Sequence, residues 1–242
     1  MLEIACFVDI GVRPKNDDRA AINKKLVAEG SFSETTENSC MVVVCDGVGG
    51  EAFGNEAAEI TADIFSGLSG KKLTIDDIKE NIKIANEAVV SAQKKKAKHS
   101  KMSTTIAGLH IYEKDFIAFN VGDSRVYRYR EPYIMQLSTD HSLCQEQINM
   151  GFKPRPEHED VITRYIGGDR AKPDIVDGKS RVHDNDIYVL CSDGVCGSLE
   201  AGDFEKILSQ EIGLEEKCKT LVNLALEKGS QDNLSIIIVR RF

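Results

Sequence analysis

Two largely apolar stretches of the chain end in an aspartate followed by a glycine. Residues 42–45 lead into Asp46-Gly47, and residues 187–192 lead into Asp193-Gly194. A strand that ends in this way delivers a carboxylate to the edge of a sheet, and the glycine lets the backbone turn sharply and approach a ligand closely. Hard divalent cations bind carboxylate and backbone carbonyl oxygens of this kind. Each pair alone is equally consistent with an ordinary Asp-Gly turn.

A third aspartate, Asp232, stands immediately before an apolar stretch, residues 234–239. In antiparallel sheets, the beginning of one strand lies beside the end of its neighbour. Asp46, Asp193 and Asp232 can therefore meet at one rim of the fold. Carboxylates gathered there would hold the pair of divalent ions that two-metal hydrolases use to activate water.

Two further segments carry charged groups that suit the same chemistry. Arg13 precedes the acidic pair Asp17-Asp18, and arginine grips phosphate oxygens in a fork geometry that lysine cannot match. The alternative for this segment is a solvated loop with an ion pair. Asp123 lies in Asn120–Arg125, between two strand-like stretches, and is a further candidate carboxylate, although that segment alone fits a hairpin turn.

Alternating or continuous apolar patterns predict the strands that would position these residues. The predicted strands are Leu2–Asp9, Arg19–Val27, Met41–Asp46, Thr104–Tyr112, Phe116–Val121, Val126–Arg130, Tyr133–Leu137, Ile187–Ser192 and Leu234–Val239. Helical periodicity predicts Asn55–Leu68, Ile75–Lys98, Asp203–Gln210 and Leu214–Lys228, the last stopped by Gly229. Thr74 and Asp77 form a capping start for the second helix.

Runs of consecutive strands separated from the helices favour an α+β fold with antiparallel sheets. Two packed sheets with helices outside each, a four-layer α-β-β-α sandwich, would explain why the strands are apolar on both faces. The 242 residues contain no repeat and no low-complexity linker, and we expect a single domain over residues 1–242.

Composition excludes some classes of protein. A net charge of −8 argues against general nucleic-acid binding, which needs a basic surface. No apolar stretch is long enough to span a bilayer, and the first residues do not resemble a signal peptide. We therefore expect a cytoplasmic protein that binds neither nucleic acid nor membrane. The basic stretch Lys94–Lys98 is best explained as a solvated helix end, with a docking patch for an acidic partner as the alternative.

The cysteines and histidines do not form ligand patterns. The seven cysteines are scattered and lack a C-x-x-C pair, which favours buried, reduced side chains over zinc or disulfide roles. The five histidines form no paired ligand motif, and His141 is the best candidate for a structural hydrogen-bonding role. Oxygen-only ligands suit manganese or magnesium better than zinc.

Taken in order along the chain, the motifs resemble those of the metal-dependent protein phosphatase family, also called protein phosphatase 2C, and the resemblance covers essentially the whole chain. The matching segments are Arg13…Asp17-Asp18, Asp46–Gly50, Met102–Thr105, Val121–Arg125, Thr139–Ser142, Ile162–Arg164, Cys191–Gly194 and Asp232–Ser235. The compact length is similar to that of the bacterial members. No cysteine stands in a C-x5-R phosphate loop, which argues against a cysteine-based phosphatase.

The resemblance implies a role for each candidate residue in a sandwich with the metals at one rim. It implies that Asp46 bridges two metals and that Gly47 lends its carbonyl. Asp193 and Asp232 would complete the second metal.

The resemblance also implies that Asp18 holds a metal-bound water, with Asp17 in the adjacent acidic position. Arg13 would receive the substrate phosphate. Asp123 matches a residue linked to a third, weaker metal in bacterial members.

At three places the sequence departs from the family pattern, and these departures affect which residue roles of the family can be assigned to this chain. Val48 stands where some members have a histidine that acts as a general acid, so the proton for the leaving group must come from water or another group. Ser103 replaces a usual glycine. The segment at about 145–160, expected to be a mobile flap beside the site, is the least family-like and is where substrate preference would be set.

The resemblance implies a serine/threonine protein phosphatase, a phosphoric monoester hydrolase that uses water activated by two Mn²⁺ or Mg²⁺ ions. Its substrate would be a phosphoprotein made by a Ser/Thr kinase, and we expect a cytoplasmic monomer that acts in signalling. Two alternatives stay open: a catalytically weak phosphoprotein-binding module, and another two-metal hydrolase such as a phosphodiesterase or nuclease.

Overall fold

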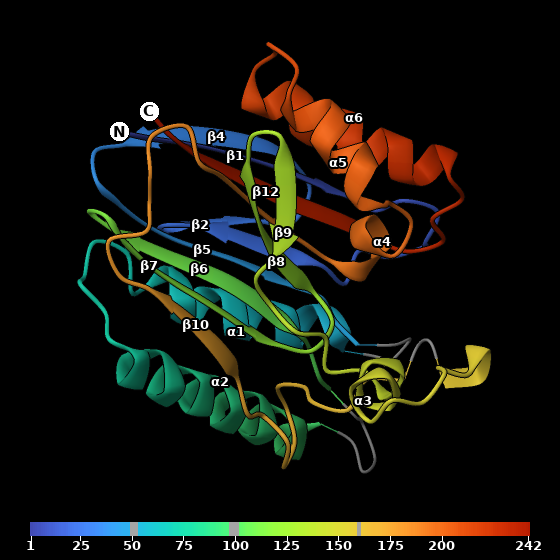
Figure 1. Ribbon diagram of the computed structural model, residues 1–242. Coiled ribbons are helices and arrows are strands. Elements are labelled where there is room, and N and C mark those ends of the chain that lie inside the picture. Colours follow the sequence, from blue (N-terminus) through green and yellow to red (C-terminus); the bar gives the residue numbers. More distant parts are fainter. Residues whose placement is uncertain (49–52, 97–101, 159–160) are drawn as a thin grey trace.

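The chain forms two packed antiparallel sheets flanked by helices (Figure 1). The computed structural model describes residues 1–48, 53–96, 102–158 and 161–242. The first sheet has the spatial order β4 (Gly30–Thr36), β1 (Leu2–Asp9), β12 (Leu234–Arg241), β11 (Ile187–Cys191), β8 (Arg125–Arg130) and β9 (Tyr133–Gln136). The second has the order β10 (Asp174–Gly178), β7 (Asp115–Val121), β6 (Ile106–Tyr112), β5 (Ser39–Cys45), β2 (Arg19–Ile22) and β3 (Lys25–Val27).

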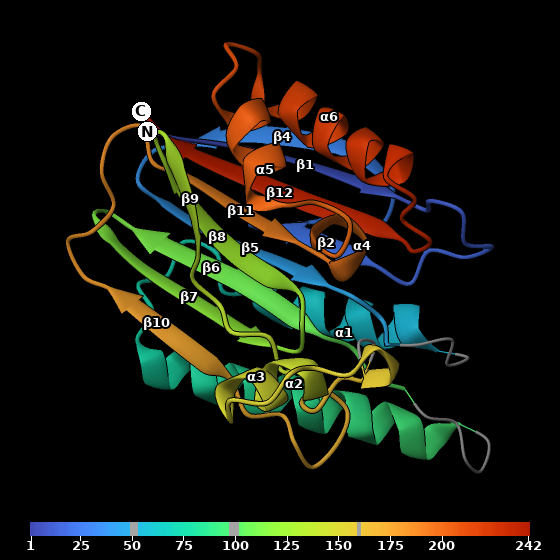
Figure 2. The ribbon, with the colours of Figure 1, turned by 45° about the vertical axis from the view of Figure 1, so that its right-hand side comes forward.

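Helices cover the outer face of each sheet, as the two views show (Figures 1 and 2). Helices α1 (Gly54–Ser66) and α2 (Ile75–Lys95) lie on the second sheet. Helices α4 (Asp193–Cys196), α5 (Ala201–Leu208) and α6 (Leu214–Glu227) lie on the first. The predicted α+β sandwich of four layers is confirmed.

Strand β5 shows why the central strands are apolar without a break. Val42 and Val44 belong to the cluster of buried residues between the two sheets. Met41, Val43 and Cys45 belong to the cluster beneath α1 and α2. Because side chains alternate between the faces of a strand, and both faces are buried here, every position must be apolar.

Several elements differ from the prediction because their sequence signal is weak. The predicted strand 19–27 is a hairpin of β2 and β3, which turns at Asn23 with a positive φ of 49°. Strands β4 and β10 were not predicted, because both are edge strands with few fully buried residues. Helix α4 is a single turn, and α3 (Leu143–Asn149) buries none of its residues, so neither has helical periodicity.

The sequence pattern predicts that Ala57, Ile60, Ile64 and Leu68 form the buried face of α1, and the structure buries Ala57 and Leu68 of this set. Ile60 and Ile64 are only partly buried, whereas Ala58, Ala62 and Phe65 are fully buried. The small alanines allow the helix to approach the sheet closely, and Phe65 stacks on Phe119 of β7 at 5.2 Å between ring centroids. The prediction is therefore confirmed for Ala57 and Leu68, whereas Ile60 and Ile64 lie at the margin of the buried face.

The cysteines behave as predicted, as free and largely buried packing residues. All seven are unpaired in the described structure, and six of them are buried, with Cys144 partly exposed. Burial raises the pKa of the Cys40 thiol to about 12, which keeps that side chain protonated. Among the described residues, no helix is both long and apolar enough to cross a membrane.

Helix α2 begins with the predicted capping box. The backbone N–H of Asp77 donates to the Thr74 hydroxyl at 3.2 Å, and the Asp77 carboxylate accepts from the backbone N–H of Thr74 at 2.7 Å. The helix buries Ile78, Ile82, Ala85 and Val89 at helical spacing. Its predicted last residues, 97 and 98, lie outside the described residues.

Removing the cap should destabilise the fold without touching the rim that carries the aspartates. We expect Thr74→Ala to lower the free energy of unfolding by about 1 kcal/mol, because the backbone N–H of Asp77 loses its partner and the Asp77 carboxylate loses the bond from the Thr74 hydroxyl. Urea unfolding measures this change. Thr74→Ser keeps the oxygen and serves as the control, and equal stability of the alanine and serine variants would contradict the expectation.

Candidate metal centre

The ends of three strands bring the predicted carboxylates to one rim. Asp46 follows the last residue of β5 in the second sheet. In the first sheet, β11 and β12 are antiparallel neighbours, with Cys191 opposite Ile236. Asp193 lies just beyond the end of β11, and Asp232 lies just before the start of β12, so the two aspartates leave the same edge of that sheet.

Asp46 and Asp193 meet although they come from different sheets. Burial raises the pKa of Asp46 well above its usual range, and the negative charges of Asp193, Asp18 and Asp123 raise it further. Asp193 raises the pKa of Asp46 both through its charge and as a hydrogen-bonding neighbour. The ends of β5 and β11, although they belong to different sheets, therefore contribute to a single acidic cluster.

Asp18 is the deepest member of this cluster. Only 1% of its surface is exposed, and burial raises its pKa to about 7. The Ser192 hydroxyl donates to Asp18 Oδ2 at 2.8 Å and opposes that increase. The charges of Asp193 and Asp232 raise the pKa, so Asp18 faces both of them.

Asp123 lies in the tight turn between β7 and β8. The turn depends on Gly122, whose φ of +113° is rarely adopted by other residues. Burial, then the charge of Asp193, raises the pKa of Asp123 to about 7. Its Oδ1 atom is buried and has no hydrogen-bond partner among the described residues. A buried oxygen of this kind is stabilised by a cation.

Arg13 lies at the edge of the cluster and not within it. Its Nη2 atom is 2.8 Å from Oδ2 of Asp232, and both side chains are nearly half exposed. Asp193 and Asp46 also act on the charge of Arg13, so the guanidinium stands beside the acidic cluster. A half-exposed arginine there can meet an anion that approaches from solvent.

The contacts of Asp17 give it a different role from that of its neighbour Asp18. Its carboxylate accepts from the backbone N–H of Asn55 at 2.9 Å, at the first turn of α1, and forms an ion pair with Lys15 at 2.9 Å. The backbone N–H of Asp17 donates to the Asn233 side chain at 2.9 Å. Asp17 therefore ties the loop that carries Arg13 and Asp18 to the start of α1.

Gly47 is held by close backbone packing. Its N–H donates to the carbonyl of Asp17 at 3.2 Å. A Cβ at this position would lie 2.4 Å from the carbonyl carbon of Gly54, so only glycine fits. This packing fixes the backbone immediately after Asp46, including the Gly47 carbonyl that the sequence analysis named as a ligand.

Several residues that position the aspartates had no assigned role in the sequence analysis. The Thr104 hydroxyl donates to the backbone carbonyl of Asp46 at 2.7 Å, and the backbone N–H of Asp46 donates to the Thr105 hydroxyl at 3.2 Å. The Asn233 amide donates to the carbonyls of Ile10 at 2.8 Å and Lys15 at 3.0 Å. Thr104, Thr105 and Asn233 lie in segments that resemble the family, and this was the only indication in the sequence that they matter. A polar residue next to a strand does not reveal which group it will bind.

His141 has the structural role predicted for it. The backbone N–H of Gly122 donates to His141 Nδ1 at 3.1 Å, which leaves the proton on Nε2, 3.3 Å from Asp174 Oδ2. Burial, together with the charge of Arg164, lowers the pKa of the imidazole. Of the other histidines, His99 lies outside the described residues.

The donor set fits hard divalent cations. As it stands, no group of three or more acidic, histidine or cysteine side chains in the described part of the chain is arranged to hold a metal ion. The carboxyl groups nevertheless repel one another, and Asp123 Oδ1 lacks a partner among the described residues. Oxygen atoms that are crowded, buried and acidic suit Mn²⁺ or Mg²⁺. The assignment of individual ligands stays a prediction.

Residues 19–234 match the model of the protein phosphatase 2C family. The chain belongs to the protein phosphatase 2C family. Among its relatives, "Protein phosphatase PhpP" of Streptococcus pneumoniae is 28% identical over 98% of this chain and 97% of that protein. The crystal structure of "Serine/threonine phosphatase Stp1" from Staphylococcus aureus is 27% identical, with a TM-score of 0.85 over 100% of this chain and 96% of that one.

A more distant protein phosphatase 2C structure shares the fold. The catalytic domain of the serine/threonine protein phosphatase PstP, crystallised in complex with two manganese ions, is 20% identical to this chain. Its TM-score is 0.79, and the match covers 99% of each chain. At this identity, the likeness concerns the fold alone.

In this protein phosphatase 2C chain, Gly194 should be needed to keep Asp193 beside Asp232. A Cβ at Gly194 would lie 2.0 Å from the backbone oxygen of Asn233, so Gly194→Ala must push the two strand ends apart. We expect the free energy of unfolding to fall by about 1–3 kcal/mol and Mn²⁺ to raise the melting temperature less than in the wild type.

The matched control is Gly202→Ala in α5, where a new Cβ meets nothing within 4 Å. This change should stabilise the helix by about 0.5–1 kcal/mol. Calorimetry with and without Mn²⁺ measures both variants. A Gly194→Ala protein that gains as much from Mn²⁺ as the wild type would show that this close approach is not required.

The raised pKa values predict how the metal-free protein responds to pH. Asp18 has a folded pKa of about 7 against 3.8 for the free side chain, so between these values the folded state holds more protons than the unfolded state. Stability must therefore fall as the pH rises from 4 to 7. Asp46 and Asp123 act in the same direction.

Asp18→Asn should make this dependence shallower and should stabilise the metal-free protein near neutral pH, because the variant buries no charge. Unfolding in urea with EDTA, across this pH range, measures the slope. A wild-type protein whose stability rises with pH over the same range would contradict the expectation.

Proposed function

We propose that this chain is a metal-dependent serine/threonine protein phosphatase, a phosphoric monoester hydrolase that uses Mn²⁺ or Mg²⁺. The observation that carries the proposal is the convergence of aspartates at one rim: Asp46 follows β5 of the second sheet, Asp193 and Asp232 flank the paired ends of β11 and β12 of the first, and Asp18 is buried among them. Membership of the protein phosphatase 2C family and the names of the relatives support it.

Each rim residue receives the role that its position suits. Asp46 stands between the two sheets and would bridge two ions, with the Gly47 carbonyl as an additional ligand. Asp193 and Asp232, at the edge of the first sheet, would complete the second ion. Two divalent ions, when bound, supply the positive charge that activates water for attack on phosphorus and stabilises the oxygens of the transition state.

The residues around the ions would position the attacking water and the substrate phosphate. Asp18 is buried and accepts from Ser192, so its remaining oxygen is available to orient water at the metals. Asp123, with a buried oxygen that lacks a partner in the described structure, would serve a third, weaker ion. Arg13, half exposed at the edge of the cluster, would bind the substrate phosphate with its fork of N–H donors.

Position 48 supplies no group that could donate a proton to the leaving oxygen. Val48 has no acidic group, and its backbone N–H donates to the carbonyl of Ser103 at 3.0 Å. The leaving serine or threonine oxygen would therefore take its proton from water or from another group.

The substrate would be a phosphoprotein made by a Ser/Thr kinase, and the chain would act as a monomer in cytoplasmic signalling. The predicted flap, at about 145–160, exposes Ile148, Met150 and Phe152, with exposed fractions of 51%, 69% and 66%. Apolar side chains held in solvent suit contact with a protein substrate better than with a free phosphate ester. Residues 159 and 160 of this segment lie outside the described residues.

Removal of a carboxylate that would hold the metal ions should abolish catalysis. We expect Asp46→Asn and Asp193→Asn each to lower Mn²⁺-dependent turnover of a phosphothreonine peptide by more than about 100-fold, since even outer-shell changes at metal sites cost 10–100-fold. Asp76→Asn is the matched control, because its side chain is 91% exposed at the start of α2.

Circular dichroism and urea unfolding must show that the variants are folded. Turnover near the wild-type level in either Asp46→Asn or Asp193→Asn would remove the basis of the proposal. Faster Mn²⁺-dependent hydrolysis of single-stranded DNA than of phosphopeptide would identify a nuclease instead.

A further inference from the structure

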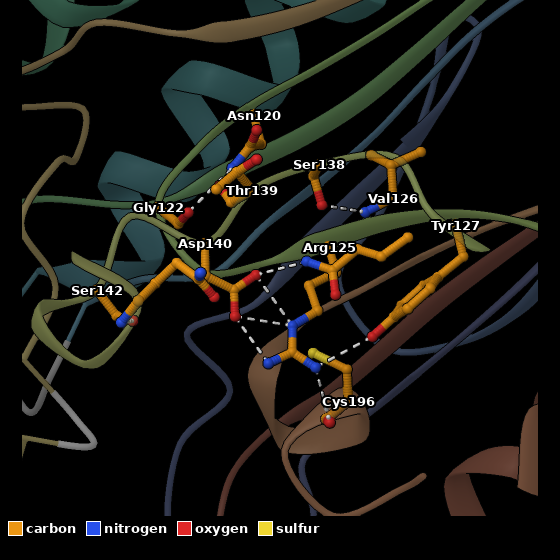
Figure 3. Close-up of polar contacts among 12 residues, drawn as sticks. Asn120, Gly122, Arg125, Val126, Tyr127, Ser138, Thr139, Asp140, Ser142 and Cys196 are labelled. Atoms are coloured by element: carbon orange, nitrogen blue, oxygen red, sulfur yellow. Dashed lines mark hydrogen bonds and ion pairs between the residues drawn. The ribbon is translucent and has the colours of Figure 1, made fainter. Parts of the chain in front are cut away.

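Arg125, the first residue of β8, makes an unusually complete set of bonds close to the metal centre (Figure 3). Its Nε atom donates to both oxygens of Asp140, at 3.0 and 2.9 Å, and Nη2 donates to Asp140 Oδ2 at 2.7 Å. The Asp140 side chain is 11% exposed. A two-point pair of this kind, shielded from water, fixes both side chains in orientation as well as in distance.

The other side of the same guanidinium reaches a different segment. Nη1 donates to the Tyr127 hydroxyl at 3.1 Å and to the backbone carbonyl of Cys196 at 3.3 Å. Cys196 is the last residue of α4, the one-turn helix that begins at Asp193. Arg125 therefore holds the end of the short helix whose first residue is a candidate ligand, as Figure 3 shows.

Asp140 belongs to a segment that is hydrogen-bonded to the turn that carries Asp123. The backbone N–H of His141 donates to the carbonyl of Gly122 at 3.0 Å, and the N–H of Gly122 donates back to His141 Nδ1 at 3.1 Å. The Asn120 amide donates to the carbonyl of Thr139 at 2.8 Å. Residues 139–141 and the turn that carries Asp123 thus form one hydrogen-bonded unit.

We propose that Arg125 is a positioning residue that joins the turn of Asp123 to the helix of Asp193, so that the two carboxylates can hold a divalent cation together. The inference rests on the proposed function. The two segments belong to different parts of the chain, and Arg125 contacts one through Asp140 and the other through Cys196. The pairing of β8 with β11, in which Arg125 lies opposite Cys191, already brings the two segments together. The Arg125 side chain adds the bonds that fix the turn of Asp123 and the end of α4 in orientation.

The same strand supplies a matched control at its opposite end. Arg130, the last residue of β8, makes a comparable two-point pair with Asp186, at 2.7 Å from Nε to Oδ1 and 2.8 Å from Nη2 to Oδ2. Asp186 is 1% exposed, and Arg130 also donates to the carbonyl of Arg181. The chemistry is the same, but the pair lies at the end of the strand remote from the aspartates.

The experiment compares Arg125→Gln with Arg130→Gln in the full chain, with Mn²⁺ alone as the ligand. We expect Arg125→Gln to weaken Mn²⁺ binding by about 10-fold, measured by calorimetric titration, because groups that orient metal ligands typically contribute about 10- to 100-fold to metal affinity. Arg130→Gln should lose stability in urea but bind Mn²⁺ as the wild type does. Phosphopeptide turnover by Arg125→Gln should need more Mn²⁺ for half-maximal rate yet approach the wild-type rate at saturation.

Arg125→Lys tests the geometry, since lysine keeps the charge but cannot span Asp140 and Cys196 at once. We expect an affinity close to that of Arg125→Gln, whereas full rescue by lysine would overturn the proposal by showing that charge alone matters. Wild-type Mn²⁺ affinity in folded Arg125→Gln, or an equal loss in Arg130→Gln, would overturn it too. If Arg125→Gln does not fold, Asp140→Asn is judged by the same measurement.

The outcome separates this inference from the proposed function. An inactive Asp46→Asn protein together with normal Mn²⁺ binding by Arg125→Gln would reject only the positioning role. An active Asp46→Asn protein would reject the proposed function itself.

Discussion

Repulsion among buried carboxylates is the constraint on which the arrangement of this molecule depends. Each of these groups loses hydration when the sheets pack, and each raises the pKa of its neighbours, as the shifts of Asp18, Asp46 and Asp123 show. An isolated chain would relieve the repulsion by moving the loops apart. The fold prevents this because the aspartates stand at the ends of strands whose other residues fill the core between and outside the sheets.

The groups that hold the carboxylates in place are mostly neutral. Hydroxyl and amide side chains (Ser192, Thr104, Thr105 and Asn233) bind the aspartates or their backbone. Neutral donors fix geometry without cancelling negative charge, so the cluster keeps its attraction for cations. The arginines are placed differently: Arg13 pairs with Asp232 at the exposed edge, and Arg125 pairs with Asp140 behind the site.

The sequence predicted those parts of the fold whose signal is local. Buried strands such as β5 and β11 are apolar at nearly every position, and the Asp-Gly pairs that follow them indicated where carboxylates would gather. Edge strand β4 and helix α3 face solvent, so their hydrophobic pattern is weak and neither was predicted. Which residues of α1 are buried depends on how closely the helix approaches the sheet, and the sequence pattern does not give that distance. Likewise, nothing in the sequence connects Thr104 with Asp46, because their contact exists only after β5 and β6 pair.

Metal binding and folding are linked in this chain through the same side chains. A buried aspartate that destabilises the metal-free fold at neutral pH, such as Asp18, becomes favourable once a cation offsets its charge. Replacing it with a neutral residue would relieve the repulsion and remove a ligand at once. Stability and activity therefore oppose each other at this rim, as they often do where a site is built from strained or repelling groups. The fold can sustain that cost because the repelling groups stand at the ends of strands that are buried on both faces.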